Sequence, residues 1–161
     1  PMEDYPIKTS SPEQIQRELD VFVKEGRQSF AISGGEPTLL KGRLLSLIAD
    51  ARKGGIRFVE LQTNAILLDS AYVADLKEAG LTSAFVSFLS HVPVHHDSLA
   101  GLEGAFQLCI DGIRALLAAG ISVTLNPVIA KETQGLVVEY VHRCEAHYEE
   151  MLCQDRCTAN G

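Results

Sequence analysis

The sequence predicts an α/β fold in which four or more βα units share one parallel sheet. Short apolar runs, typical of buried strands, alternate with segments whose apolar residues recur at helical spacing. The connections between them are only a few residues long and contain glycine or proline. This alternation is typical of βαβ units joined by right-handed crossovers. With 161 residues, 46% of them hydrophobic, the chain can bury one core, and we expect a single domain over residues 1–161.

Each predicted helix shows a start signal, a stripe of apolar residues or a glycine at its end. Ser11 and Pro12 supply an N-cap hydroxyl and a proline at the first helical position, and Gly26 ends that helix. Asp69 can cap a later helix that stops at Gly80. The predicted helices span residues 12–25, 40–53, 70–79, 106–119 and 136–148.

The predicted strands are apolar runs bounded by turn residues, and they span residues 28–33, 56–63, 83–90 and 121–129. Ligands of parallel sheets bind at the carboxyl ends of the strands, whether the sheet is open or closed into a barrel. Polar residues at those ends are therefore candidate binding residues. They are Glu36, Thr63, Asn64, Ser87, Ser90 and Asn126.

A turn with two adjacent glycines follows the first predicted strand, at residues 33–38 (SGGEPT). Gly34 and Gly35 allow a sharp turn and leave room for a ligand to approach the main chain. Glu36 places a carboxylate beside that opening, and Pro37 removes an N–H donor before the next helix begins. A phosphate cradle would need more glycines and usually a lysine. We therefore expect a ligand with a cationic amino group.

Charge and hydropathy exclude several classes of protein. The net charge of −7 argues against a nucleic-acid binder or a protein of anionic membrane surfaces, because both polyanions would repel it. No apolar run is long enough to span a bilayer, and the acidic N-terminal residues differ from a signal peptide. We expect a cytoplasmic protein whose four cysteines are reduced thiols or metal ligands rather than disulfides.

Five segments carry a further signal when they are taken together. They are residues 32–37 (ISGGEP), 61–64 (LQTN), 85–88 (FVSF), 96–101 (HDSLAG) and 104–123. In this order on a βα scaffold, they resemble the radical S-adenosylmethionine (radical SAM) enzymes over roughly residues 11–133. Ala65 departs from the pattern, since it stands where that family usually has glycine.

The resemblance implies an incomplete, partial (β/α) TIM-type barrel that binds S-adenosylmethionine (SAM) and a 4Fe-4S cluster. In this family the cluster reduces SAM, and the resulting 5'-deoxyadenosyl radical removes a hydrogen atom from a substrate, here an unspecified small molecule or peptide. By this resemblance Glu36 and the turn around it hold the amino group of SAM, and polar strand ends bind its carboxylate and ribose oxygens. The implied SAM-binding residues are Gly34, Gly35, Glu36, Pro37, Thr63, Asn64, Ser87 and Asn126.

The cysteines depart from the family pattern. The family's Cys-x3-Cys-x2-Cys loop would lie upstream of Pro1, and the first cysteine present is Cys109. Near the C-terminus, Cys153 and Cys157 form a Cys-x3-Cys pair followed by Asn160 in the position of a third ligand. Residues 150–161 are either a displaced, degenerate cluster loop with Cys153 and Cys157 as metal ligands, or an unrelated tail. Cys109, between Leu108 and Ile110, is predicted to be a buried apolar residue.

A polar loop is predicted over residues 91–104, and the function of its histidines has two interpretations. His91, His95, His96 and Asp97 can contact a substrate, or they can bind zinc or iron. Two alternative functions follow from these departures: a SAM-binding or structural module without catalysis, and a metal-dependent hydrolase built on the histidine loop. An incomplete barrel also exposes an edge strand, through which we expect a homodimer.

Overall fold

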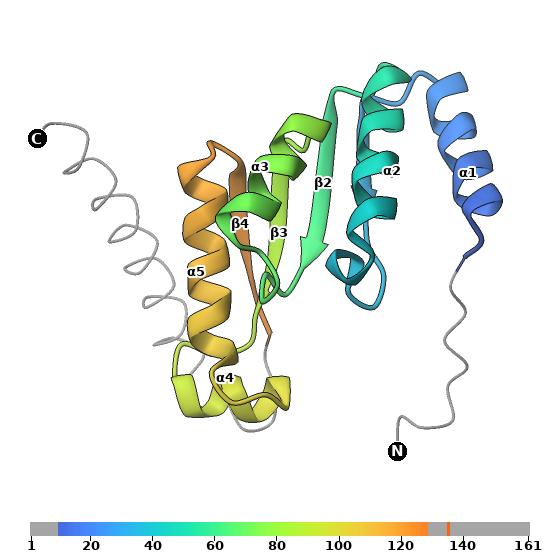
Figure 1. Ribbon diagram of the computed structural model, residues 1–161. Helices are drawn as coiled ribbons and strands as arrows, with labels where there is room; N and C mark the ends of the chain where they lie inside the picture. The colour runs from blue at the N-terminus through green and yellow to red at the C-terminus, as the bar shows by residue number, and fades with distance from the viewer. Residues whose placement is uncertain (1–9, 129–134, 136–161) are drawn as a thin grey trace, which may run out of the picture.

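The computed structural model describes residues 10–128 and Gly135, and a four-stranded sheet forms their centre (Figure 1). The strands are β1 (Ser29–Ile32), β2 (Phe58–Thr63), β3 (Ser83–Phe88) and β4 (Ser122–Pro127). They lie side by side in chain order, and every neighbouring pair is parallel. The predicted parallel α/β fold is confirmed, and the sheet formed by these residues is open.

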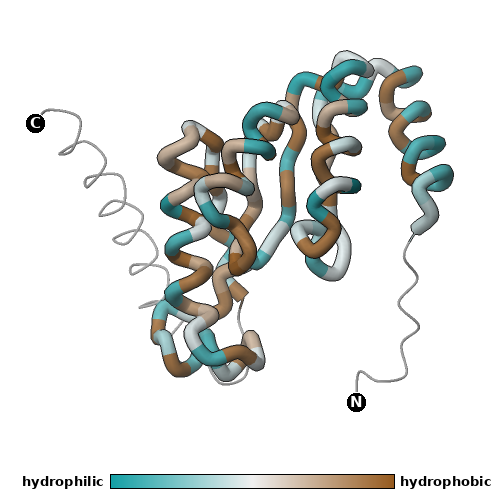
Figure 2. Tube along the Cα trace, in the orientation of Figure 1, coloured by the Kyte–Doolittle hydropathy of each residue, from teal (hydrophilic) through white to brown (hydrophobic). Residues whose placement is uncertain are grey.

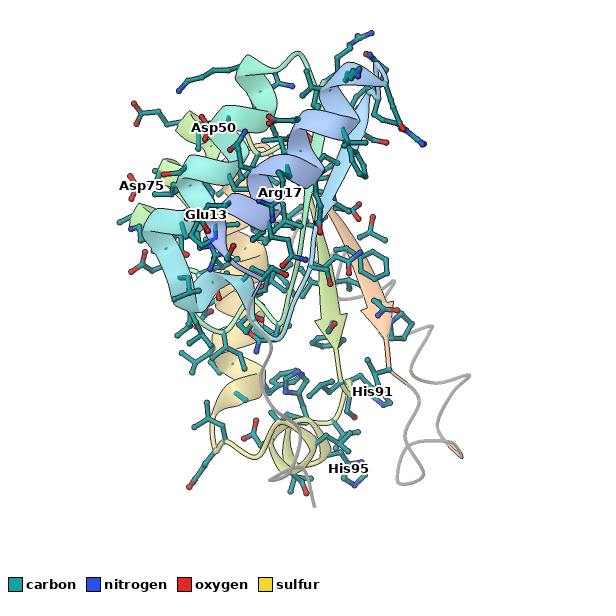
Figure 3. All side chains as sticks on the ribbon, turned by 90° about the vertical axis from the view of Figure 1, so that its right-hand side faces the viewer. Glu13, Arg17, Asp50, Asp75, His91 and His95 are labelled. Atoms are coloured by element: carbon teal, nitrogen blue, oxygen red, sulfur yellow. The ribbon has the colours of Figure 1, made fainter. Side chains whose placement is uncertain are left out.

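The helices are α1 (Pro12–Lys24), the 3-10 helix η2 (Pro37–Leu40), α2 (Lys41–Lys53), α3 (Ser70–Ala79), α4 (Pro93–Ala100) and α5 (Ala105–Ala118). Helices α2, α3 and α5 lie against one face of the sheet, as the two perpendicular views show (Figures 1 and 3). The strand order never reverses, so successive right-handed crossovers place these helices on the same face. This is the wall of a TIM-type barrel rather than a doubly wound sheet.

The core lies between the sheet and these helices. Alternate residues of β2 and β3 are buried there, and the residues between them are only partly buried. Helix α5 adds Cys109, Ile113 and Leu116, which are fully buried. Figure 2 shows the same amphipathic pattern in α1, whose hydrophobic residues lie on its side toward α2. Strand alternation therefore separates a helix-covered face from an opposite face that is less covered within the described residues.

The local capping signals behave as predicted. Ser11 accepts a hydrogen bond from the Gln14 amide at 3.2 Å, and Asp69 accepts one from the Tyr72 amide at 2.7 Å. Gly80 ends α3 in the left-handed region at φ +107°, which favours glycine. Short side chains at these positions thus determine where the helices begin and end.

One predicted element was wrong. Residues 91–104 were predicted as a loop, but α4 occupies Pro93–Ala100 within them. Pro93 stands at the first helical position and Gly101 ends the helix at φ +67°, so both end signals are present. The histidine-rich composition concealed a short helix.

Two predicted elements fall partly or wholly outside the described part of the chain. The predicted helix 136–148 lies outside it, as does the last residue of the predicted strand 121–129. Among residues 10–128, no helix is both long and apolar enough to cross a lipid bilayer.

Candidate functional site

The Glu36 carboxylate lies at the carboxyl edge of the sheet and accepts four hydrogen bonds. Its Oε1 accepts from the Thr38 amide at 3.1 Å, the Thr38 hydroxyl at 2.6 Å and the Thr63 hydroxyl at 2.8 Å. Its Oε2 accepts a hydrogen bond from the main-chain N–H of Asn64 at 2.8 Å. Glu36 is therefore both the N-cap of η2 and the link between the turn after β1 and the end of β2.

The end of β2 is organised by its own short polar side chains. The Thr63 hydroxyl also accepts a hydrogen bond from the Ala65 amide at 3.0 Å, and the Asn64 side-chain oxygen accepts one from the Ile66 amide at 3.1 Å. Together these bonds turn the chain away from the sheet. Ala65 takes φ +61° inside the turn, a left-handed conformation that costs a residue with a Cβ about 1–2 kcal/mol. The backbone at this position therefore favours glycine over the alanine that is present.

The turn after β1 leaves its main chain open. Ser33, Gly34 and Gly35 are exposed. A Cβ added at Gly34 or Gly35 would meet no atom within 4 Å among the described residues. A ligand can therefore approach the main chain of this turn directly beside the half-buried Glu36.

The predicted site residues share one edge of the sheet but not one face. Thr63 is paired in register with Val86, and both are buried on the face covered by helices. Ser87 and Asn126 are also paired in register, but strand alternation turns them to the opposite face, where both are partly exposed. Ser90 is buried, and its hydroxyl accepts a hydrogen bond from the Val92 amide at 3.1 Å.

The histidines and Asp97 do not converge on one point. His91 and His95 lie beyond the carboxyl ends of the strands (Figure 3). His96 is 1% exposed and packs against the rings of Phe88 and Phe106, at centroid distances of 5.5 and 5.7 Å, while those two rings also contact each other at 5.8 Å. Both Asp97 oxygens accept main-chain hydrogen bonds at the start of α5, from Gly104 at 2.7 Å and Phe106 at 2.8 Å.

These surroundings set the charge states of the His96 and Asp97 side chains. Burial lowers the pKa of His96 below its usual value, and the neighbouring Asp97 charge opposes this only in part. The two main-chain amides lower the pKa of Asp97. A neutral imidazole and an ionised capping carboxylate are the result.

Metal ligation has no support in the described part of the chain. Three or more histidine, cysteine or acidic side chains do not come together there in a way that could hold a metal ion. Cys109 is fully buried in α5, as predicted, and burial raises the pKa of its thiol to about 12. Since cluster ligands are thiolates, Cys109 does not fit a 4Fe-4S cluster. Cys153 and Cys157 lie outside the described residues.

Two further residues of the site were not among those predicted. Thr38 is 2% exposed, and its carbonyl oxygen accepts a hydrogen bond from the Tyr72 hydroxyl at 2.8 Å. Burial, with a smaller contribution from the Glu36 charge, raises the pKa of Tyr72. The Lys41 ammonium lies 4.5 Å from the centre of the Tyr72 ring and pairs with Asp75 at 2.8 Å. The position of Thr38 directly after Glu36 and Pro37 could have indicated that it belongs to the site. The sequence around Tyr72 gives no such indication.

Comparison with family models identifies the family of this chain. The model described as the Radical SAM superfamily matches residues 3–144. The AdoMet-dependent heme synthase of Nitratidesulfovibrio vulgaris (strain Hildenborough) is 28% identical over 144 residues, which are 89% of this chain and 38% of that protein. The probable GTP 3',8-cyclase of Sulfurisphaera tokodaii is 34% identical over 131 residues, 81% of this chain and 41% of that protein. The chain thus spans about two fifths of the length of these curated relatives.

A solved structure with the same fold is that of native anSMEcpe with bound AdoMet. It superposes with a TM-score of 0.67 over 93% of this chain and 42% of that chain, at 19% sequence identity. At this identity the likeness shows the fold alone.

Proposed function

Because this chain belongs to the radical SAM superfamily, we propose that it binds SAM at the turn formed by residues 33–36. The observation that carries the proposal is the half-buried Glu36 carboxylate, held at the sheet edge beside two exposed glycines. An ammonium group is the natural partner of such a carboxylate, and carbonyl groups of the open turn can accept its remaining hydrogens.

The chain's own residues fit the parts of SAM unequally. Glu36, Gly34 and Gly35 would hold the amino group, as the open main chain and the ordered carboxylate allow. Ser87 and Asn126, paired on the less covered face, would donate and accept hydrogen bonds with the ribose or carboxylate oxygens. Thr63 is buried, and its hydroxyl already contacts Glu36 and Ala65, so we assign it to the protein side of the site.

SAM bound here would supply the carbon radical with which members of this superfamily remove a hydrogen atom from a substrate. The 4Fe-4S cluster does not fit Cys109, so its ligands would come from outside the described residues, with Cys153 and Cys157 as candidates. The two relatives have different names, a heme synthase and a GTP cyclase, which supports no single substrate. A small molecule or a peptide is proposed.

Calorimetry with SAM tests the binding proposal. A Gly35→Val variant should fold normally, because a Cβ at this position meets no described atom within 4 Å, yet lose SAM affinity by at least tenfold because the added side chain would occupy the space assigned to the ligand. Gly42→Ala, on α2 and also without a neighbour within 4 Å, is the control. Unchanged affinity in Gly35→Val would contradict the assigned position, and no SAM binding by the parent protein would overturn the proposal.

A second candidate function is SAM binding without cluster chemistry, because the contacts that form the Glu36 site involve no cysteine among the described residues. After anaerobic iron and sulfide reconstitution, a radical enzyme should hold iron and release 5'-deoxyadenosine upon dithionite reduction. A protein that binds SAM without cluster chemistry should bind SAM but release no 5'-deoxyadenosine. A Cys153→Ala, Cys157→Ala variant that retains all its iron would exclude these two cysteines as ligands.

A further inference from the structure

The geometry around Glu36 points to Thr38 and Thr63 as positioning residues for SAM. We propose that their hydroxyls hold Oε1 of Glu36 so that Oε2 faces the amino group of the ligand. This inference rests on the proposed function, since it deepens the assignment of that binding site.

The two carboxylate oxygens of Glu36 are used unequally. Oε1 receives three donors, from the Thr38 amide and from the hydroxyls of Thr38 and Thr63. Oε2 receives one donor among the described residues, the Asn64 amide. A carboxylate oxygen offers about two acceptor positions, so Oε1 is saturated and Oε2 keeps one position for a ligand.

The direction of each hydroxyl is set by its other contacts. The Thr63 oxygen accepts from the Ala65 amide, which leaves its own hydrogen for Glu36. The Thr38 hydroxyl lies 2.6 Å from Oε1, a distance typical of a hydroxyl donating to a charged oxygen. If either hydroxyl turned away, Oε1 would lose one of its three donors and Glu36 one of its fixed contacts.

Burial keeps Thr38 and Thr63 from acting as ligands themselves. They are 2% and 4% exposed, whereas Glu36 is half-buried. The Tyr72 hydroxyl holds the Thr38 carbonyl from α3, so η2 cannot shift freely to compensate for a lost bond. The two threonines therefore reach the ligand only through Glu36. Without either hydroxyl, the carboxylate would have more rotamers and would pay more ordering entropy on binding.

The test compares SAM with 5'-methylthioadenosine, which lacks the whole amino-acid portion of SAM and with it the amino group. In Thr38→Val or Thr63→Val the dissociation constant for SAM should rise about tenfold, which equals about 1.4 kcal/mol. The constant for 5'-methylthioadenosine should not change. Thr38→Ser and Thr63→Ser keep the hydroxyl and should bind SAM like the parent protein.

A double-mutant cycle adds an independent measurement. If Thr38 acts through Glu36, Thr38→Val should cost no further SAM affinity in a Glu36→Leu background. Equal weakening of both ligands, no weakening of either, or failure of the serine variants to restore affinity would overturn the inference. If both valine variants unfold, Thr38→Ala and Thr63→Ala, which also lack the hydroxyl, replace them in the same comparison. If the parent protein itself did not bind SAM, this result would instead refute the proposed function.

Discussion

The hydroxyl of Thr63 lies 2.8 Å from Oε1 of Glu36, although 27 residues separate them in the chain. The bond joins the end of β2 to the turn that follows β1, at the edge of a parallel sheet where ligands bind. Glu36 therefore has a structural role in addition to the ligand role proposed above. Substitution of Glu36 should affect both stability and SAM binding, and the two effects can be measured separately.

Glu36→Gln should lower the free energy of unfolding by about 1 kcal/mol, near the lower end of the cost of leaving a donor without its acceptor, because the donor concerned is only partly buried. The side-chain oxygen of the glutamine can still accept hydrogen bonds from Thr38 and Thr63. Its side-chain nitrogen would then face the main-chain N–H of Asn64, which needs an acceptor. Urea unfolding measures the change. Glu103→Gln, in an exposed position, is the control and should stay within about 0.5 kcal/mol of the parent. A Glu36→Gln protein as stable as this control would contradict the structural role.

Gly112→Ala should destabilise the fold by at least about 2–3 kcal/mol, because overpacking forces the backbone to shift. A Cβ at Gly112 of α5 would overlap the carbonyl oxygen of Ala65, in the turn after β2. Gly42→Ala is the matched control, because Gly42 is also helical and its added Cβ meets open space. That control should be neutral or gain up to about 1 kcal/mol from helix propensity. Equal stabilities of the two variants in urea would refute the close approach of α5 to this turn.

His96 should make stability depend on pH in the acidic range. Its pKa is lowered in the folded protein from an ordinary value of 6.5, because the buried ring resists charging. Below about pH 6.5 the unfolded chain binds more protons, so stability is complete above this pH and falls as the pH drops toward the lowered pKa of the folded state.

The measurement is a series of urea unfolding curves from pH 7.5 to pH 5. His96→Leu should flatten the dependence, since leucine suits a buried site against the rings of Phe88 and Phe106 and does not titrate. His95→Gln is the control and should keep the slope of the parent. An unchanged slope in His96→Leu would show that other groups cause the dependence.

Cys109 should resist alkylation in the folded state. With a thiol pKa of about 12, the thiolate fraction at pH 8 is on the order of 10⁻⁴, and the side chain is fully buried. Iodoacetamide followed by mass spectrometry of the Cys109 peptide should show little modification without denaturant and rapid modification in guanidinium. Rapid modification of the native protein would mean that α5 opens readily or packs differently.

Much of the fold could be predicted from local patterns because the signals act over short distances. Helical spacing, the N-caps Ser11 and Asp69, and glycines such as Gly80 determine the elements within a few residues. The alternation of strands and helices then restricts the topology to parallel pairing with right-handed crossovers. The glycine-rich turn also stood out, since few other reasons place two adjacent glycines, a glutamate and a proline after a strand.

Only the tertiary structure decided which side chains of these elements contact one another and which face of the sheet they occupy. Strand register sets Thr63 beside Val86 on the covered face and turns Ser87 and Asn126 to the other face. The contact between Glu36 and Thr63 requires β1 and β2 to pair in a register that brings their carboxyl ends together, and no local sequence pattern encodes that register. Packing likewise buries His96 against two phenylalanine rings, and its polar neighbours in the chain give no sign of this burial. The sequence alone thus determined the elements, their order and the carboxylate at the turn, whereas contacts between distant residues decided how that carboxylate is held.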